Sequence, residues 1–436
     1  MKKARGKAVR SQNDEMSPPV RSRGWRGPFA IATIVLLSAA VVVLSFELHR
    51  VKNRGSASRF FFPSRGMPHA AQDLENPTGN STGPWGRLTS RAVMIEPADT
   101  ILTPDYFEPF ADAWYLTDAM ATNLESFLRS AGLSTEEVTN LMASAEYNAD
   151  VRQFRLFPDR EMLLNMNPET RATIYAELAK CEMNALQREP FRMRTTSADT
   201  WFQGCGLRKE VVAMMERMLY RRGPFLMFSD PGILMAELPS PAERRQAMRT
   251  LFRQRALFCS IHIEPGDDVE ALSRYWGSGG RVAAVQPLID SMADAGGGDL
   301  DVSLLLPPLA RTFLYSYPRP ENTVFRDCHW TSLNYFLVAP DDRFADREYA
   351  TDMFVSNYTV VTGTNYLPGD VFVFQSADDQ VIHTCNYIAD GVVFTKNGGT
   401  AHRPWVLLDL SSVVDLYSLQ GSVKIDVLRR TEDMTR

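Results

Sequence analysis

The chain has 436 residues, enough for two or three domains of roughly 100–200 residues each. Apolar residues make up 44% of it and charged residues 23%, a balance that excludes a wholly disordered or fibrous protein. Residues 1–65 hold 13 Lys and Arg against 3 Asp and Glu, whereas the rest of the chain is acidic and the net charge is −5. A basic head on an acidic body indicates either a nucleic-acid-binding arm or a segment beside a membrane.

An uncharged stretch of 19 residues, PFAIATIVLLSAAVVVLSF, decides between the two. It is long enough to cross about 30 Å of hydrocarbon and longer than the apolar core of a cleaved signal peptide, about 7–15 residues. We expect a transmembrane signal anchor over residues 28–47, after a basic cytoplasmic leader over residues 1–27. Because more basic residues precede the stretch than follow it, the C-terminal domains of this single-pass protein of the inner (plasma) membrane are expected to be exported to the periplasm. No nucleic acid is expected as a partner.

Residues 48–98 are expected to form a flexible linker, since NPTGNSTGPWG is rich in turn-forming residues and poor in apolar ones. Residues 99–304 are expected to form a mainly helical domain. In SPAERRQAMRTLF, for example, Ser240 is a suitable cap, Pro241 opens the helix and Glu243 lies in its first turn. Two short runs, FLMFSD and LFCSIHIEP, are candidate strands.

The pattern changes after about residue 305. The segments DVFVFQS (370–376), VIHTCNYIA (381–389) and GVVFTKN (391–397) are short, β-branched and aromatic, and turn residues separate them, which predicts an antiparallel meander. A helix over residues 328–337 precedes it. The predicted fold class is therefore α+β, with an N-terminal transmembrane helix, a mostly helical middle domain and a C-terminal domain (305–436) in which a helix packs on an antiparallel sheet.

Cysteine chemistry is left open by the sequence. An odd number of cysteines leaves at least one thiol unpaired within the chain: Cys181, Cys205, Cys259, Cys328 and Cys385. Strand alternation puts Cys385 on the same face as His383, as a core residue or half of a disulfide. A disulfide between Cys328 and Cys385 would exclude a nucleophilic Cys328.

The stretch DCHWTSLN carries the strongest functional signal. If Asp327 caps a helix, Cys328 lies in its first turn, where backbone N–H groups would stabilise a thiolate and an oxyanion. His383 would be the base, and Asn397 would orient its imidazole and fix the tautomer. The alternatives are a buried structural cysteine and an Asn-Gly turn. No metal or cofactor is expected, because His262 has no companions at ligand spacing.

These residues resemble the papain-like cysteine peptidases, and in particular their NlpC-like bacterial branch of cell-wall peptidases and amidases. The resemblance covers roughly residues 305–410 and rests on three short segments: Asp327-Cys328, Pro368-Gly369-Asp370, and Tyr387-Ile388-Ala389-Asp390-Gly391. It implies a papain-like fold, a Cys328–His383–Asn397 site and cleavage of amide bonds in cell-wall peptides. It also implies that a tyrosine before the nucleophile, Tyr317 or its rival Tyr315, helps form the oxyanion site.

The chain departs from this family directly after the cysteine, where His329-Trp330 replace the usual Ser-Gly and would reshape the cleft. Two other functions therefore stay open. One is acyl transfer on the same fold. The other is an inactive scaffold that binds a protein partner through the helical domain.

Overall fold

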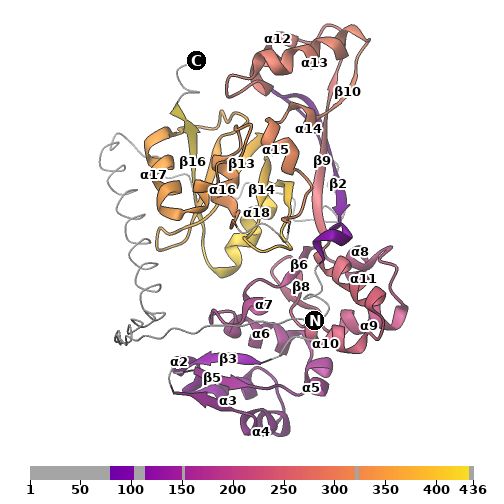
Figure 1. The fold of residues 1–436 in the computed structure, drawn as a ribbon, viewed down its shortest axis with the longest axis vertical. Helices are drawn as coiled ribbons and strands as arrows, with labels where there is room; N and C mark the ends of the chain where they lie inside the picture. Colours follow the sequence, from indigo (N-terminus) through magenta and orange to yellow (C-terminus); the bar gives the residue numbers. More distant parts are fainter. Residues whose placement is uncertain (1–78, 103–112, 150–152, 320–323, 432–436) are drawn as a thin grey trace, which may run out of the picture.

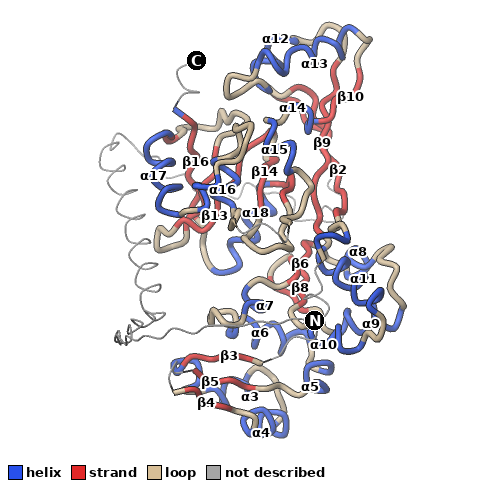
Figure 2. Tube along the Cα trace, in the orientation of Figure 1, coloured by secondary structure: helices blue, strands red, loops and turns tan. Residues whose placement is uncertain are grey.

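The computed structural model describes residues 79–102, 113–149, 153–319 and 324–431. These residues form an elongated molecule in which two long strands, β2 (Gly86–Ile95) and β9 (Gln254–Ile263), run beside the C-terminal part (Figure 1). Helix accounts for 41% and strand for 26%, so the fold is mixed α/β, and strands alternate with helices through the whole described chain (Figure 2).

The long strands belong to a four-stranded antiparallel sheet in the order β1–β2–β9–β10, whose edges are β1 (Gly79–Gly83) and β10 (Gly298–Asp301). Nine residue pairs join β2 to β9, from Arg87 opposite His262 to Ile95 opposite Gln254. Between β9 and the C-terminal part, the chain forms α12 (Val269–Trp276), α13 (Val282–Asp294), the edge strand β10 and α14 (Val302–Leu305). One apolar core joins this sheet to the C-terminal part.

The middle of the chain holds two small antiparallel sheets with helices packed around them. The first has the order β3–β5–β4 and the second β6–β8–β7. The elements of the first are η2 (Asp99–Ile101), β3 (Trp114–Thr117), α2 (Asp118–Ala121), α3 (Leu124–Ser130), α4 (Thr135–Ala143), β4 (Glu146–Asn148) and β5 (Gln153–Leu156). Those of the second are α5 (Arg160–Asn165), α6 (Pro168–Leu178), α7 (Ala185–Arg188), β6 (Phe191–Arg194), α8 (Ala198–Phe202), α9 (Lys209–Arg217), β7 (Tyr220–Arg222), β8 (Phe225–Phe228), α10 (Pro231–Glu237) and α11 (Pro241–Phe252).

The C-terminal part is built around a six-stranded antiparallel sheet. Its order is β11 (Tyr358–Val360), β16 (Lys424–Arg430), β12 (Val371–Gln375), β13 (Val381–Ala389), β14 (Val392–Lys396) and β15 (Trp405–Asp409). The elements α15 (Pro308–Phe313), α16 (Cys328–Leu333), η4 (Asp342–Ala345) and α17 (Arg347–Asn357) share the apolar core on one face. On the other face, α18 (Leu410–Tyr417), followed by η5 (Ser418–Gln420), covers a second core.

The strands expected at 370–376, 381–389 and 391–397 are found as β12, β13 and β14. Asp390 and Gly391 join β13 to β14 with φ of 44° and 73°, the left-handed pair that a two-residue hairpin turn requires. The helix after Cys328 ends at Leu333, sooner than expected.

The prediction of a mainly helical domain over residues 99–304 is wrong, because strands β3 to β10 lie within it. Most of them have only three or four residues, too few for a visible period-two pattern. The linker predicted over residues 48–98 is also corrected for residues 79–95, which form β1 and β2. Pairing with β9 orders this polar stretch, an interaction that a local pattern does not reveal.

The predicted membrane architecture is corrected as well. Among the described residues, no helix has the length and apolar character needed to cross a membrane. The anchor expected at residues 28–47 and the leader before it lie outside the described residues. The expected single-pass membrane helix is therefore not found in the part of the chain that the structure describes, and the membrane location is not proposed further.

A buried ion pair gives a test of the middle region. Arg171 of α6 and Asp230, before α10, are almost fully buried and bonded, and the Tyr175 hydroxyl also donates to Asp230. Asp230→Ala is expected to lower the free energy of unfolding by about 3–5 kcal/mol, because it leaves a buried guanidinium unpaired. The exposed pair of Glu125 with Arg129 is the control, and Glu125→Ala should cost less than about 1 kcal/mol. If denaturant titrations showed the same loss of unfolding free energy in the two variants, the buried ion pair would not have the stabilising role described here.

Candidate functional site

Cys328 is the first residue of α16, and Asp327 caps that helix. The Trp330 backbone N–H donates to Asp327 Oδ1 (3.0 Å), as an N-cap requires. The cysteine is 7% exposed, whereas Cys385 on the neighbouring strand is 0% exposed. Cys328 is thus at the edge of the core rather than inside it.

Two side chains of β13 fix α16 on the sheet. The Thr384 hydroxyl donates to the Cys328 carbonyl oxygen (3.0 Å), and Asn386 Nδ2 donates to the Ser332 carbonyl oxygen (3.3 Å). Strand alternation directs these two residues toward α16 and directs His383 and Cys385 toward the opposite core. A bulge between Phe374 and Gln375 on the partner strand lies beside His383 at the start of β13.

The His383 imidazole is held by a hydrogen-bond relay. Its Nε2 lies 2.9 Å from Thr395 Oγ1, and the Thr395 hydroxyl donates to Asn397 Oδ1 (3.0 Å). Because the single hydroxyl proton goes to Asn397, the Thr395 oxygen accepts from His383 Nε2–H. The neutral imidazole therefore carries its proton on Nε2, which leaves a lone pair on Nδ1. That atom is buried and has no hydrogen-bond partner.

This relay corrects the role predicted for Asn397. The asparagine was expected to contact the imidazole itself, but Thr395 lies between them. The ring is fixed further by stacking on Tyr417 of α18, with centroids 4.2 Å apart and planes 15° apart. Phe374 contacts its edge at 5.4 Å.

The electrostatics favour a thiolate at Cys328. Burial alone would raise the pKa of this thiol, but the neighbouring imidazoles of His329 and His383 stabilise the anion and hold the pKa well below its ordinary value. Burial would likewise lower the pKa of His329, yet the Cys328 thiolate and Asp327 raise it to about 9. A thiolate and an imidazolium therefore coexist across neutral pH.

The site has one grouping that could offer ligands to a metal ion. Within the described chain, the ligand atoms of Asp327, Cys328 and His329 lie within 4.8 Å of one another. One carboxylate oxygen of Asp327 already accepts the Trp330 N–H, and the thiol faces two imidazoles. The arrangement matches acid–base chemistry at a nucleophile.

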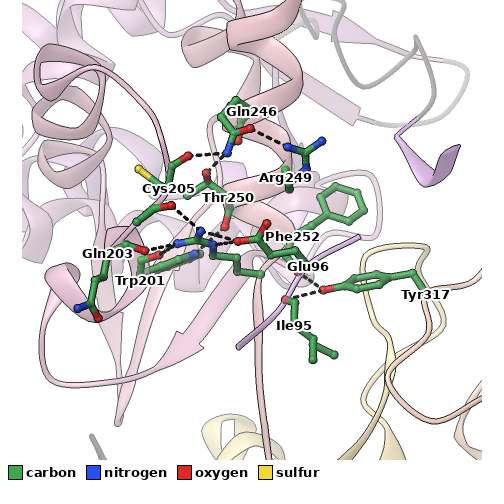
Figure 3. A network of polar contacts seen from close by, with 12 residues as sticks. Ile95, Glu96, Trp201, Gln203, Cys205, Gln246, Arg249, Thr250, Phe252 and Tyr317 are labelled. Carbon is green, nitrogen blue, oxygen red and sulfur yellow. Dashed lines mark hydrogen bonds and ion pairs between the residues drawn. The ribbon is translucent and has the colours of Figure 1, made fainter. Parts of the chain in front are cut away.

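The tyrosines predicted to support an oxyanion site are engaged elsewhere. The Tyr317 hydroxyl donates to the carbonyl oxygen of Phe252 (2.7 Å), the last residue of α11, and its ring points toward Ile95 at the end of β2 (Figure 3). Tyr315 donates to the Leu257 carbonyl oxygen (2.6 Å) in β9. The Tyr317 hydroxyl thus binds the end of α11 and the Tyr315 hydroxyl binds β9, so neither tyrosine is placed to donate to a substrate at Cys328.

Cys328 forms no disulfide, and Trp330 beside it packs into the core. The five cysteines are free. Burial, and to a smaller extent the negative charge of the nearby Cys328, raise the pKa of the Cys385 thiol well above its ordinary value, as expected for a thiol in the core. Trp330 was expected to reshape the cleft, but it is 1% exposed and packs in the core against Phe313. Its indole N–H donates to Asp342 Oδ1 (3.0 Å).

Sequence reasoning missed three residues of the site: His329, Thr395 and Tyr417. His329 stands next to the predicted nucleophile, and this adjacency was interpreted only as a steric departure. Thr395 is two residues before Asn397 on the same strand, which was an available signal. Tyr417 comes from α18, about 30 residues from the strand it covers, and no local pattern indicates it.

Comparisons of the chain with models of protein families, with curated proteins and with solved structures found no match. Inference about function therefore depends on the geometry of the site.

The relay predicts a specific effect of Thr395. Thr395→Val keeps the side-chain shape but removes the acceptor for His383 Nε2–H, so His383 stabilises the thiolate less. The pH midpoint of Cys328 alkylation by iodoacetamide should rise by about one unit, since a hydrogen bond to a charged group contributes about 1.5–3 kcal/mol. Thr395→Ser retains the hydroxyl and should keep the midpoint of the unmodified chain. Identical midpoints in the valine and serine variants would show that the relay does not act on the thiol.

Proposed function

We propose that this chain is a cysteine hydrolase that cleaves amide bonds through Cys328, with His383 as base and acid. The observation that carries the proposal is a thiol between two imidazoles, of which one, His383, is fixed by Thr395 and Asn397. A low thiol pKa and an oriented base are the two requirements for nucleophilic cysteine catalysis.

The chemistry follows from the position of each proton. The Cys328 thiolate attacks the carbonyl carbon, and a tetrahedral oxyanion forms. The proton that the Cys328 thiol has lost is held on His383 Nδ1 and passes from there to the leaving amine, so that the C–N bond breaks and a thioester remains on Cys328. Water loses a proton to His383 Nδ1 and attacks the thioester, which releases a carboxylic acid and restores the thiolate. His329 stays protonated and stabilises the thiolate before and after each turnover.

The resemblance to NlpC-like enzymes favours peptides of the bacterial cell wall as substrates. Because the predicted export is not retained, the sequence resemblance alone supports this substrate. The region over residues 99–304 would position the substrate or a protein partner. Acyl transfer differs from hydrolysis only in the acceptor, an amine or alcohol in place of water. An inert scaffold would have no use for a thiol of low pKa.

The test is to incubate the purified chain with cell-wall fragments and to map any cleaved bond by mass spectrometry. The expected result is a new carboxylate and a new amine at one amide bond. Cys328→Ala should lower the rate by at least about a thousandfold, because the covalent step is lost. Cys181→Ala, which removes a buried cysteine outside the site, should leave the rate unchanged. Cleavage that persists in Cys328→Ala would rule out the mechanism.

A further inference from the structure

Three cationic side chains surround the turn that follows β14. Arg192 of β6 donates to the Asn397 carbonyl oxygen (3.0 Å), and Lys396 Nζ donates to the Gly398 carbonyl oxygen (2.6 Å). A Cβ atom at Gly398 would lie 3.4 Å from Arg403 Cγ. Arg192, Lys396 and Arg403, here called the cation cluster, thus meet at one turn although they come from two parts of the chain.

The cation cluster has too little negative charge around it. A Cβ atom at Gly398 would lie 3.2 Å from Glu189 Oε2, the carboxylate that faces all three cations. That oxygen is buried and has no hydrogen-bond partner. Arg403 is 1% exposed and donates from Nη2 to the Pro190 carbonyl oxygen, whereas its Nε and Nη1 have no partner. A buried guanidinium left in this state is unfavourable unless an anion joins it.

Arg253 shows what a structural arginine looks like in the same chain. It is 5% exposed, and its Nε donates to Glu96 while Nη1 donates to the carbonyl oxygens of Trp201 and Gln203. Its Nη2 forms an ion pair with Glu96. Every nitrogen of Arg253 therefore has a partner, in contrast to Arg403.

The cation cluster adjoins the site around Cys328. Lys396 lies within electrostatic reach of Asp327 and Cys328. Asn397, whose carbonyl oxygen binds Arg192, is also the last residue of the relay to His383. Of the cation cluster, Arg192 alone lines a cavity of about 60 Å³, together with Asn397, and this cavity is large enough for a group of carboxylate size.

We propose that the cation cluster is a subsite for a carboxylate of the substrate. The proposal rests on the function proposed above and narrows its substrates to amides that carry a free carboxylate near the scissile bond. The Lys396 ammonium lies near the Asp327 carboxylate and the Cys328 thiolate, and Glu189 offsets one of the two guanidinium charges. The remaining single charge fits a monoanion, and guanidinium groups suit the carboxylate as acceptor.

Two alkylating reagents of equal shape and different charge test the subsite at Cys328. Iodoacetate carries a carboxylate and iodoacetamide does not, so the ratio of their rates reports anion recognition separately from thiolate formation. In the full chain the iodoacetate rate should saturate with concentration, and propionate should compete with it. Arg403→Gln and, as a less buried alternative, Arg192→Gln should each lower the ratio by about threefold or more.

Arg274→Gln is the matched control. It removes the same charge from an exposed pair on α12, and the ratio should not change. Iodoacetamide rates that stay normal in both cluster variants, with an unchanged ratio and no competition by propionate, would overturn the subsite and leave the nucleophile intact. A Cys328 that iodoacetamide labels no faster than the other cysteines would instead overturn the proposed function.

A second measurement does not use the thiol. In Cys328→Ala protein, propionate should raise the unfolding temperature above that in chloride at equal ionic strength, and Arg403→Gln should abolish this increase. An increase of equal size in both proteins would contradict the subsite.

Discussion

The hydrogen bond from Thr384 to the carbonyl oxygen of Cys328 is the contact on which the site depends. It joins the first residue of α16 to β13 at the residue next to His383. Because neighbouring side chains of a strand point to opposite faces, Thr384 can bind the helix only if His383 faces the second core, where Thr395 and Tyr417 hold it. A shift of β13 by one residue would exchange these roles and separate the thiol from its base.

The surroundings of Cys328 explain why the anion is tolerated near a core. An isolated thiolate would be unfavourable there, and two imidazoles compensate for the lost solvation. They have different parts to play. His329 follows the cysteine in α16 and provides charge, while His383 is held at a fixed orientation, as the proposed proton exchange requires. The buried cations around Asn397 extend this positive environment behind the relay.

The C-terminal sheet was the part of the fold that the sequence predicted most closely, because β12 to β14 are long enough to show β-branched runs and a two-residue Asp-Gly turn. The middle region was mispredicted as mainly helical, since most of its strands have only three or four residues, too few to show a period of two. Asp327 was predicted as the cap from its position before Cys328. The contacts of Tyr317 and Thr395 were not predicted, because they depend on how the β2–β9 sheet and the β13–β14 hairpin meet their neighbours.

The ultraviolet absorbance of the Cys328 thiolate tests the account most directly. The difference between the unmodified chain and Cys328→Ala should show a thiolate at neutral pH, where an ordinary cysteine, with a pKa of about 8.5, is mostly protonated. His329→Gln should move the appearance of this absorbance to higher pH, because the imidazolium that stabilises the anion is lost. A difference spectrum in which the thiolate appears only above about pH 8.5, with or without His329, would contradict the central claim that this fold ionises Cys328.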